Sequence, residues 1–304
     1  MLSFLVLGGS LFILVKGSDW FVDSAERLGL ALGVSPFIIG VTIVAFGTSL
    51  PELASSISSV LNHQSEIVSG VVIGSNITNI LLVLGLVSTV GRVVNMDYDI
   101  MDIDMPMLIG SAFLLWFAMS DQMISTFEAI IFLVGLTIFL VNSLSGNEKN
   151  DLVRPKANWQ DIFLLILGGV FVKYGADFTV NAIGQLAEGF AMETSVLAQT
   201  LVALGTSLPE VAVSITAALK GKPGIAVGNV LGSNIFNTYA VMSIPSFFGT
   251  LKINDDTTSF YLPFMVACTI LFAAISIGGR ITKWEGYMLL IFYVYFFNHS
   301  FGIF

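Results

Sequence analysis

Long apolar segments, separated by short groups of polar residues, glycine and proline, run from one end of the chain to the other. They cover about residues 2–31, 37–62, 67–90, 103–119 and 123–143, and then about 159–190, 195–219, 224–249, 258–277 and 283–303. A helix needs about 20 residues to cross the hydrocarbon core of a membrane. The pattern therefore predicts an all-α integral membrane protein with ten transmembrane helices.

The longest polar stretch, residues 144–158, separates the two sets of apolar segments. Its Asn, Gly, Pro and charged residues are typical of a connecting loop. We therefore expect a single membrane domain, in which a short linker at 144–158 joins a first five-helix repeat at 1–143 to a second five-helix repeat at 159–304.

Two sequence motifs occur once in each half of the chain. Residues 42–52 (TIVAFGTSLPE) match residues 200–210 (TLVALGTSLPE) at nine of eleven positions, with a spacing of 158 residues. Residues 70–79 match residues 228–237 at seven of ten positions with the same spacing. Because each half has an odd number of predicted spans, the second copy enters the membrane in the opposite orientation. Such inverted-topology repeats are typical of secondary transporters.

The amino-acid composition excludes an ordinary soluble protein. Hydrophobic residues make up 55% of the chain and charged residues 11%, whereas about 25% of the residues in an ordinary soluble domain are charged. The net charge of −9 argues against a basic surface that binds nucleic acid. We expect membrane lipid around the protein, no nucleic acid, and no obligatory protein partner.

The distribution of Lys and Arg predicts the orientation in the cell membrane, because cytoplasmic loops carry an excess of these residues. With the N-terminus outside, Lys252 lies on the outer side, and the inner side collects Arg27, Arg92, Lys149, Arg154, Lys156, Lys220, Lys222, Arg280 and Lys283. We therefore expect both termini outside and the linker at 144–158 in the cytoplasm.

Four further polar residues within the spans have simple structural interpretations. Lys16 and Lys173 each precede an aspartate by a few residues, which favours local ion pairing or snorkelling over a transport role. Asn76 and Asn234 are expected to form hydrogen bonds between helices.

Glu52 and Glu210 each lie in the middle of an apolar span. An ionised carboxylate at that depth costs about 2.5 to 3.5 kcal/mol unless it is paired. The spans contain too few cations to pair both glutamates. We therefore expect their partner to be a metal cation or a proton. A purely structural role, in which the two glutamates only hold helices together, is disfavoured.

The residues around Glu52 supply further oxygen atoms. Thr48 and Ser49 precede it by four and three residues and share its helical face. Pro51 has no N–H and crowds the carbonyl of Gly47, so we expect the helix to open there and expose carbonyl groups to a cavity. The second half repeats this arrangement with Ala203, Gly205, Thr206, Ser207, Pro209 and Glu210.

The third span of each half adds a hydroxyl and an amide one helical turn apart, at Ser75 and Asn79 and at Ser233 and Asn237. All donors of the predicted site are oxygen atoms, with no His or Cys for Zn or Cu. Hard cations such as Ca²⁺ suit this donor set, and so does dehydrated Na⁺. Two glutamates balance one Ca²⁺, and we expect no cofactor beyond the transported ions.

The two GTSLPE motifs at 47–52 and 205–210 and the two GSNxxN motifs at 74–79 and 232–237 resemble the repeats of the Ca²⁺/cation antiporter superfamily. The similarity is closest to prokaryotic sodium/calcium exchangers. It implies ten helices in two inverted halves, Ca²⁺ and Na⁺ sites at mid-membrane, and first and sixth spans that slide across this core.

The resemblance also implies a set of ion ligands. Carried onto this chain, they are the carbonyls of Ala45 and Ala203 and the side chains of Thr48, Ser49, Glu52, Ser75, Asn79, Thr206, Ser207, Glu210, Ser233 and Asn237. Potassium-dependent relatives carry an aspartate where this chain has Asn237, which argues against K⁺ co-transport.

These observations predict a secondary antiporter that exchanges Ca²⁺ for Na⁺ by alternating access. A proton/Ca²⁺ antiporter, with Glu52 and Glu210 as proton carriers, is the alternative that the sequence leaves open. An intramembrane enzyme with an acidic dyad would not need the duplicated hydroxyls. A passive channel is disfavoured because deep carboxylates bind Ca²⁺ tightly.

Overall fold

The structure is a computed structural model that describes residues 2–90, 94–95, 100–145, 155–189 and 194–301. For residues 2, 94–95, 145, 186–189, 194–204, 206 and 301 it describes the backbone and not the side chains. The protein is almost entirely helical, and its helical runs coincide with the apolar segments expected from the sequence.

The first half contains helices of several kinds and two short strands. They are α1 (Leu2–Ala31), α2 (Pro36–Ile39), η1 (Gly40–Val44), α3 (Ala45–Leu61), α4 (Glu66–Thr78), η2 (Asn79–Val83), α5 (Leu84–Val90), β1 (Val94–Asn95), α6 (Asp104–Ala118), η3 (Met119–Asp121), β2 (Met123–Ile124) and α7 (Thr126–Ser145).

The second half follows a similar order. Its elements are α8 (Trp159–Gly189), α9 (Thr194–Leu219), α10 (Pro223–Phe236), η4 (Asn237–Val241), η5 (Ile244–Phe247), β3 (Leu251–Lys252), η6 (Thr257–Tyr261), α11 (Leu262–Ser276), β4 (Arg280–Ile281) and α12 (Lys283–Phe301). Here η1, η2, η4 and η6 are π-helical, and η3 and η5 are 3₁₀ turns.

Several helical runs are long and apolar enough to cross a membrane. Within the described residues there are six of them, at Ser3–Ala31, Pro36–Leu61, Glu66–Val90, Thr126–Leu144, Trp159–Gln185 and Thr257–Ser276. Helices suit the apolar interior of a membrane because every backbone hydrogen bond is made within the segment. The structure is therefore that of a multi-pass membrane protein.

The expectation that the chain opens at Gly47 is wrong. Helix α3 runs without interruption from Ala45 to Leu61 with Pro51 inside it, and α9 likewise contains Pro209. A proline removes one backbone hydrogen bond, and neighbouring helices and Ser or Thr side chains can support the segment at that point. The irregular backbone lies before α3, in the π-helical turn Gly40–Val44.

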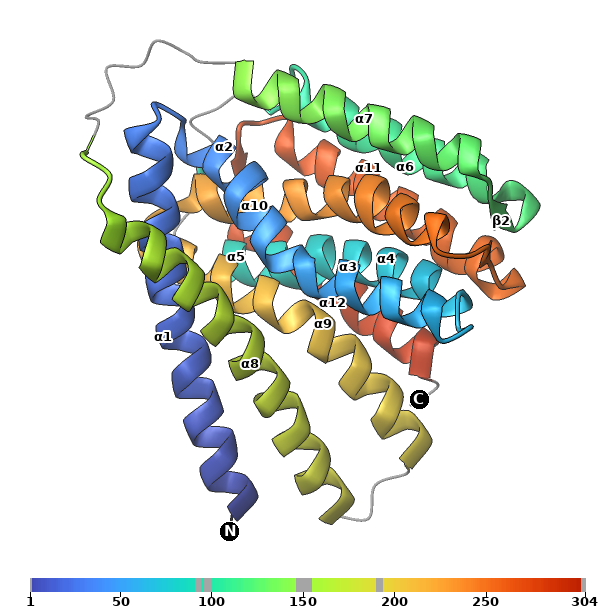
Figure 1. The fold of residues 1–304 in the computed structure, drawn as a ribbon, viewed down its shortest axis with the longest axis horizontal. Coiled ribbons are helices and arrows are strands. Elements are labelled where there is room, and N and C mark those ends of the chain that lie inside the picture. Colours follow the sequence, from blue (N-terminus) through green and yellow to red (C-terminus); the bar gives the residue numbers. More distant parts are fainter. Residues whose placement is uncertain (1, 91–93, 96–99, 146–154, 190–193, 302–304) are drawn as a thin grey trace.

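Helices α1 and α8 lie side by side and run obliquely past the other helices, with α9 next to α8 (Figure 1). Glycine permits their close approach: a Cβ added at Gly17 would lie 2.7 Å from the Cβ of Phe171, and one added at Gly175 would lie 2.8 Å from the Cα of Leu14. These two glycines are themselves 158 residues apart. The α1–α8 pair is thus closely packed along its contact.

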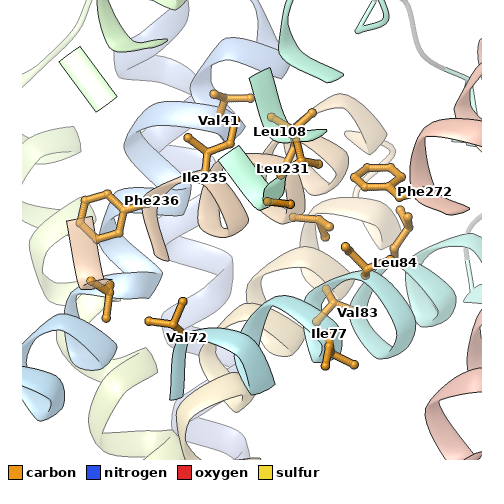
Figure 2. Close-up of a cluster of buried hydrophobic side chains, with 14 of the residues drawn as sticks. Val41, Val72, Ile77, Val83, Leu84, Leu108, Leu231, Ile235, Phe236 and Phe272 are labelled. Carbon is orange, nitrogen blue, oxygen red and sulfur yellow. The ribbon is translucent and has the colours of Figure 1, made fainter. Parts of the chain in front are cut away.

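The apolar core gathers buried side chains from both halves of the chain, including Leu231, Ile235 and Phe236 of helix α10 (Figure 2). Its labelled side chains come from η1, α4, η2, α5, α6, α10 and α11 and include Val41, Val72, Val83, Leu84, Leu108, Leu231, Ile235 and Phe272. A Cβ added at Gly232 would lie 2.3 Å from the carbonyl oxygen of Val41. Helix α10 therefore packs against the chain just before α3, which fixes these two elements of the site relative to each other.

A network of ion pairs ties α1 to the turn between α9 and α10. Lys220 lies 3.1 Å from Asp19 and 2.8 Å from Asp23, and Lys222 lies 2.7 Å from Asp23 and 2.8 Å from Glu26. Three successive turns of α1 are thereby attached to one loop.

The expected local ion pairs within the long helices are also confirmed. Lys16 lies 3.6 Å from Asp19, and Lys173 lies 2.6 Å from Asp177.

Candidate ion-binding site

Two buried glutamates from different halves of the chain meet in the interior. Glu52 on α3 and Glu210 on α9 are 0% and 2% exposed. The hydroxyl of Ser49, which precedes Glu52 by one turn, donates to Oε1 of Glu210 over 3.4 Å. The two GTSLPE segments, 158 residues apart in sequence, are therefore in contact with each other.

Several buried polar atoms of the expected ligands have no hydrogen-bond partner within the described part of the chain. They are both carboxylate oxygens of Glu52, Oε2 of Glu210, the hydroxyls of Ser75 and Ser233, Oδ1 of Asn79, and both amide atoms of Asn237. More than nine in ten buried polar groups in proteins are normally bonded. Carboxylate, hydroxyl and amide oxygens that have no hydrogen-bond partner are available to bind a cation.

The amides of the site stand at matching irregularities of the backbone. Asn79 begins the π-helical turn η2, and Asn237, 158 residues later, begins the π-helical turn η4. Such turns occur frequently at functional sites. Both asparagines are 1% exposed or less, and the repeated irregularity places them at corresponding points of the two halves.

Asn76 and Asn234 link the two halves, which confirms the expected interhelical hydrogen bonds. The Nδ2 atom of Asn76 donates to the carbonyl of Asn234 over 3.3 Å and to Oγ1 of Thr238 over 3.0 Å. The Nδ2 atom of Asn79 donates to Oδ1 of Asn234 over 3.1 Å. Because that bond uses the donor of Asn79, its Oδ1 acceptor is left for another partner.

A second chain of hydrogen bonds was not anticipated from the sequence. Oγ1 of Thr48 donates to Oδ1 of Asn229 over 3.2 Å, and Nδ2 of Asn229 donates to the hydroxyl of Ser214 over 2.9 Å. The sequence did contain an indication of this role. Asn229 is a polar residue in an apolar stretch, and it stands at one of the three positions where the two copies of the second motif differ, since the first copy has Val71.

The structure describes the side chains of some of the remaining expected ligands and only the backbone of others. Ala45 is buried at the start of α3, and its carbonyl lies 3.3 Å from Oγ1 of Thr48. Ser207 is buried on α9. Ala203 and Thr206 also belong to α9, but their side chains lie outside the described residues.

The site borders the long helices. A small pocket is lined by Thr48 and Pro51 of α3, Pro209 of α9, Phe21 of α1 and Val172 of α8. The α1–α8 pair thus covers the region where the two GTSLPE segments meet.

The donor set contains few charges and no soft ligands. Among the described residues, no group of three or more His, Cys, Asp or Glu side chains is close enough to hold one metal ion. Besides the two carboxylates, the expected ligands are hydroxyls, amides and carbonyls. Such oxygen atoms fit a hard cation better than Zn or Cu.

The sequence matches the profile of the family described as sodium/calcium exchanger protein over residues 2–145 and 161–302. Sodium/calcium exchanger MaX1 of Methanosarcina acetivorans is 35% identical over 97% of this chain and 97% of its own. Putative antiporter CaxA of Alkalimonas amylolytica is 31% identical over 93% of this chain and 94% of its own.

A solved structure shows the same fold. The structure of the sodium-calcium exchanger NCX_Mj soaked with 2.5 mM Na⁺ and 0.1 mM Ca²⁺ matches with a TM-score of 0.84 and 31% identity, over 97% of each chain. The family profile covers both halves of the chain, including both GTSLPE segments. The chain therefore belongs to the sodium/calcium exchanger family of the Ca²⁺/cation antiporter superfamily, which consists of membrane transporters rather than enzymes.

Proposed function

We propose that this protein exchanges Ca²⁺ for Na⁺ across the cell membrane by alternating access to one site between α3 and α9. The observation that carries the proposal is the meeting of Glu52 and Glu210, both buried, with oxygen atoms that have no protein partner among the described residues. A site of this kind offers what dehydrated Ca²⁺ and Na⁺ require.

The proposed ligands come from four helical segments. Glu52 and Glu210 supply the charge, and the neutral ligands are the carbonyls of Ala45 and Ala203 and the side chains of Thr48, Ser49, Ser75, Asn79, Thr206, Ser207, Ser233 and Asn237. Two carboxylates neutralise one Ca²⁺ or two Na⁺. The absence of a carboxylate at Asn79 and Asn237 argues against an additional K⁺.

The coupling between the two ions follows from electrostatics. Enclosing two ionised carboxylates in a dry interior without a cation costs several kcal/mol per charge, by about the magnitude known for buried ions. The site therefore changes access only when Ca²⁺, Na⁺ or protons neutralise it. Both ions use the same inward-facing and outward-facing states, so movement of one ion drives movement of the other.

The proposed architecture is a single membrane domain of ten spans in two inverted halves, 1–143 and 159–304. The linker at 144–158 is cytoplasmic, and both termini are outside. The positive-inside distribution of Lys and Arg supports this orientation. The recurrence of the 158-residue spacing in η2 and η4 supports the repeat.

The decisive experiment measures ⁴⁵Ca²⁺ uptake into proteoliposomes loaded with Na⁺, compared with vesicles loaded with K⁺ or choline and with vesicles under an imposed pH gradient. We expect uptake to require internal Na⁺. Uptake driven by the proton gradient alone would instead establish a proton/Ca²⁺ antiporter with the same site. Uptake without any gradient of a counter-ion would contradict exchange and indicate a channel.

A further inference from the structure

Asn229 connects three helices at the site although it is not among the proposed ligands. It is 0% exposed on α10. Its Oδ1 accepts from Thr48 of α3, and its Nδ2 donates to Ser214 of α9, which follows Glu210 by one helical turn. The bond to Ser214 uses the donor side of the amide, so Oδ1 faces Thr48 as an acceptor.

The Thr48 hydroxyl has one proton and two acceptors around it. They are Oδ1 of Asn229 at 3.2 Å and the carbonyl of Ala45 at 3.3 Å. A hydroxyl can bind a cation only through its oxygen lone pairs, so its proton must point elsewhere. A proton directed at the Ala45 carbonyl would occupy an oxygen that the cation needs.

We propose that Asn229 is a positioning residue that accepts the Thr48 proton and thereby leaves the oxygen atoms of Thr48 and Ala45 for the cation. The inference rests on the proposed function, because it assumes that these two groups face a transported ion. Ser214 contributes by holding the Asn229 amide in the orientation that presents Oδ1 to Thr48.

At this position of the repeat, the sequence has an amide acceptor in the second half of the chain and none in the first. The residue 158 positions before Asn229 is Val71, which offers no acceptor. Ser56, 158 positions before Ser214, is buried, and its hydroxyl has no hydrogen-bond partner in the described part of the protein. The two halves of the site are therefore chemically unequal, and the side containing Thr48 has the fixed proton acceptor.

The test is equilibrium binding of ⁴⁵Ca²⁺ to the purified full-length protein, which does not depend on the identity of the counter-ion. Asn229→Val copies the residue of the other half. We expect it to weaken Ca²⁺ binding about three- to tenfold, the usual range for losing one buried hydrogen bond. Thr48→Val should also weaken binding.

A double-mutant cycle separates positioning from a general structural role. If Asn229 acts through Thr48, Asn229→Val should weaken Ca²⁺ binding little further when Thr48→Val is already present. Equal effects of Asn229→Val in both backgrounds would overturn the proposal. So would unchanged binding in Asn229→Val alone.

Two matched serine variants keep the proposal testable if Asn229→Val fails to fold. Ser214→Ala removes the support of Asn229 and should weaken Ca²⁺ binding, whereas Ser56→Ala, the same change at the corresponding place, should leave it unchanged. Equal effects of the two variants would contradict the role of Asn229. If the unmodified protein binds ⁴⁵Ca²⁺ but shows no Na⁺-driven uptake, sodium/calcium exchange is refuted. The role of Asn229 is then still decided by the Ca²⁺ affinities of the variants.

Discussion

Glu52 and Glu210 occupy the same position of the repeat but have different surroundings. Glu210 accepts a hydrogen bond from Ser49, whereas neither carboxylate oxygen of Glu52 has a hydrogen-bond partner among the described residues. The described part of the protein therefore stabilises the Glu52 carboxylate less than that of Glu210. The two halves therefore supply the same residue types, but the hydrogen bonds of the two glutamates differ.

Replacing either glutamate by glutamine should abolish Ca²⁺ exchange without unfolding the protein, because the amide keeps the shape and removes the charge. In Ca²⁺-free buffer, Glu52→Gln should raise the melting temperature, since it eliminates a buried carboxylate without a bonded partner. Thermal unfolding with and without Ca²⁺ checks this, because a ligand that binds the folded state stabilises it.

The matched control is Glu66→Gln, at the exposed start of α4. It should retain both Ca²⁺ uptake and the stabilisation by added Ca²⁺. Coupled uptake that persists in Glu52→Gln and Glu210→Gln would refute the assignment of the two glutamates.

At the scale of the helix, the contact between α1 and α8 depends on glycine. Gly17→Ala places a methyl group 2.8 Å from the backbone nitrogen of Val172, and overpacking of this kind costs about 1 to 3 kcal/mol. We expect a lower melting temperature and slower ⁴⁵Ca²⁺ uptake, because α1 and α8 cover the site. Thermal unfolding and initial uptake rates measure the two effects.

Gly9→Ala is the matched control on the same helix, because a Cβ at Gly9 would meet nothing within 4 Å among the described atoms. Alanine is also the better helix former. If Gly9→Ala and Gly17→Ala lower the melting temperature equally, close packing is not the reason for the glycine at position 17.

The ion pairs between α1 and the turn before α10 give a second prediction. Burial alone would lower the pKa of Lys222, but its hydrogen bonds to Asp23 and Glu26 reverse this effect, so the pKa lies above its ordinary value of 10.5. This contribution to stability is complete below pH 10.5 and is lost as the pH rises through the higher pKa of the folded protein.

Lys222→Met should therefore lower the free energy of unfolding by about 1 kcal/mol at pH 7, the scale of partly exposed ion pairs. Its melting temperature should approach that of the unmodified protein above pH 10.5. Exposed Lys156→Met serves as the control. A pH-independent difference between Lys222→Met and the unmodified protein would attribute the effect to packing of the side chain rather than to its charge.

The sequence predicted the helical segments well because each is a long apolar run bounded by polar residues, as at Trp159–Gly189. The repeat also predicted that Glu52 and Glu210 belong together. The helix runs without interruption across Pro51. Local rules could not predict this, because a proline inside a membrane helix is tolerated where other parts of the protein support the segment. The role of Asn229 depends on contacts with two other helices, which helical periodicity within α10 cannot reveal.

The 158-residue spacing of the repeat is also found outside the sequence motifs, in the pairing of the short strands. Strands β1 and β4 pair with Val94 opposite Ile281, and strands β2 and β3 pair with Met123 opposite Lys252. Adding 158 to Val94 gives Lys252, and adding 158 to Met123 gives Ile281. Exchanging the two halves therefore maps one of these residue pairs onto the other, although no sequence motif marks these loops.

The proposed inverted arrangement predicts which loops are accessible from each side of the membrane. The native Cys268 is buried, so a single introduced cysteine provides the accessible thiol. In intact cells, a membrane-impermeant maleimide should label Lys252→Cys, which lies on the proposed outer side. It should label Asn150→Cys, in the proposed cytoplasmic linker, only after the membrane is permeabilised.

The two positions form an internally controlled pair, because each variant is tested before and after permeabilisation. Two halves inserted in opposite orientations, joined by a cytoplasmic linker, require opposite labelling of the two cysteines. Labelling of Asn150→Cys in intact cells would reverse the proposed orientation if Lys252→Cys were then protected. Labelling of both positions in intact cells would place the linker and the β3 loop on the same side, which is incompatible with five spans in the first half and three between the linker and Lys252.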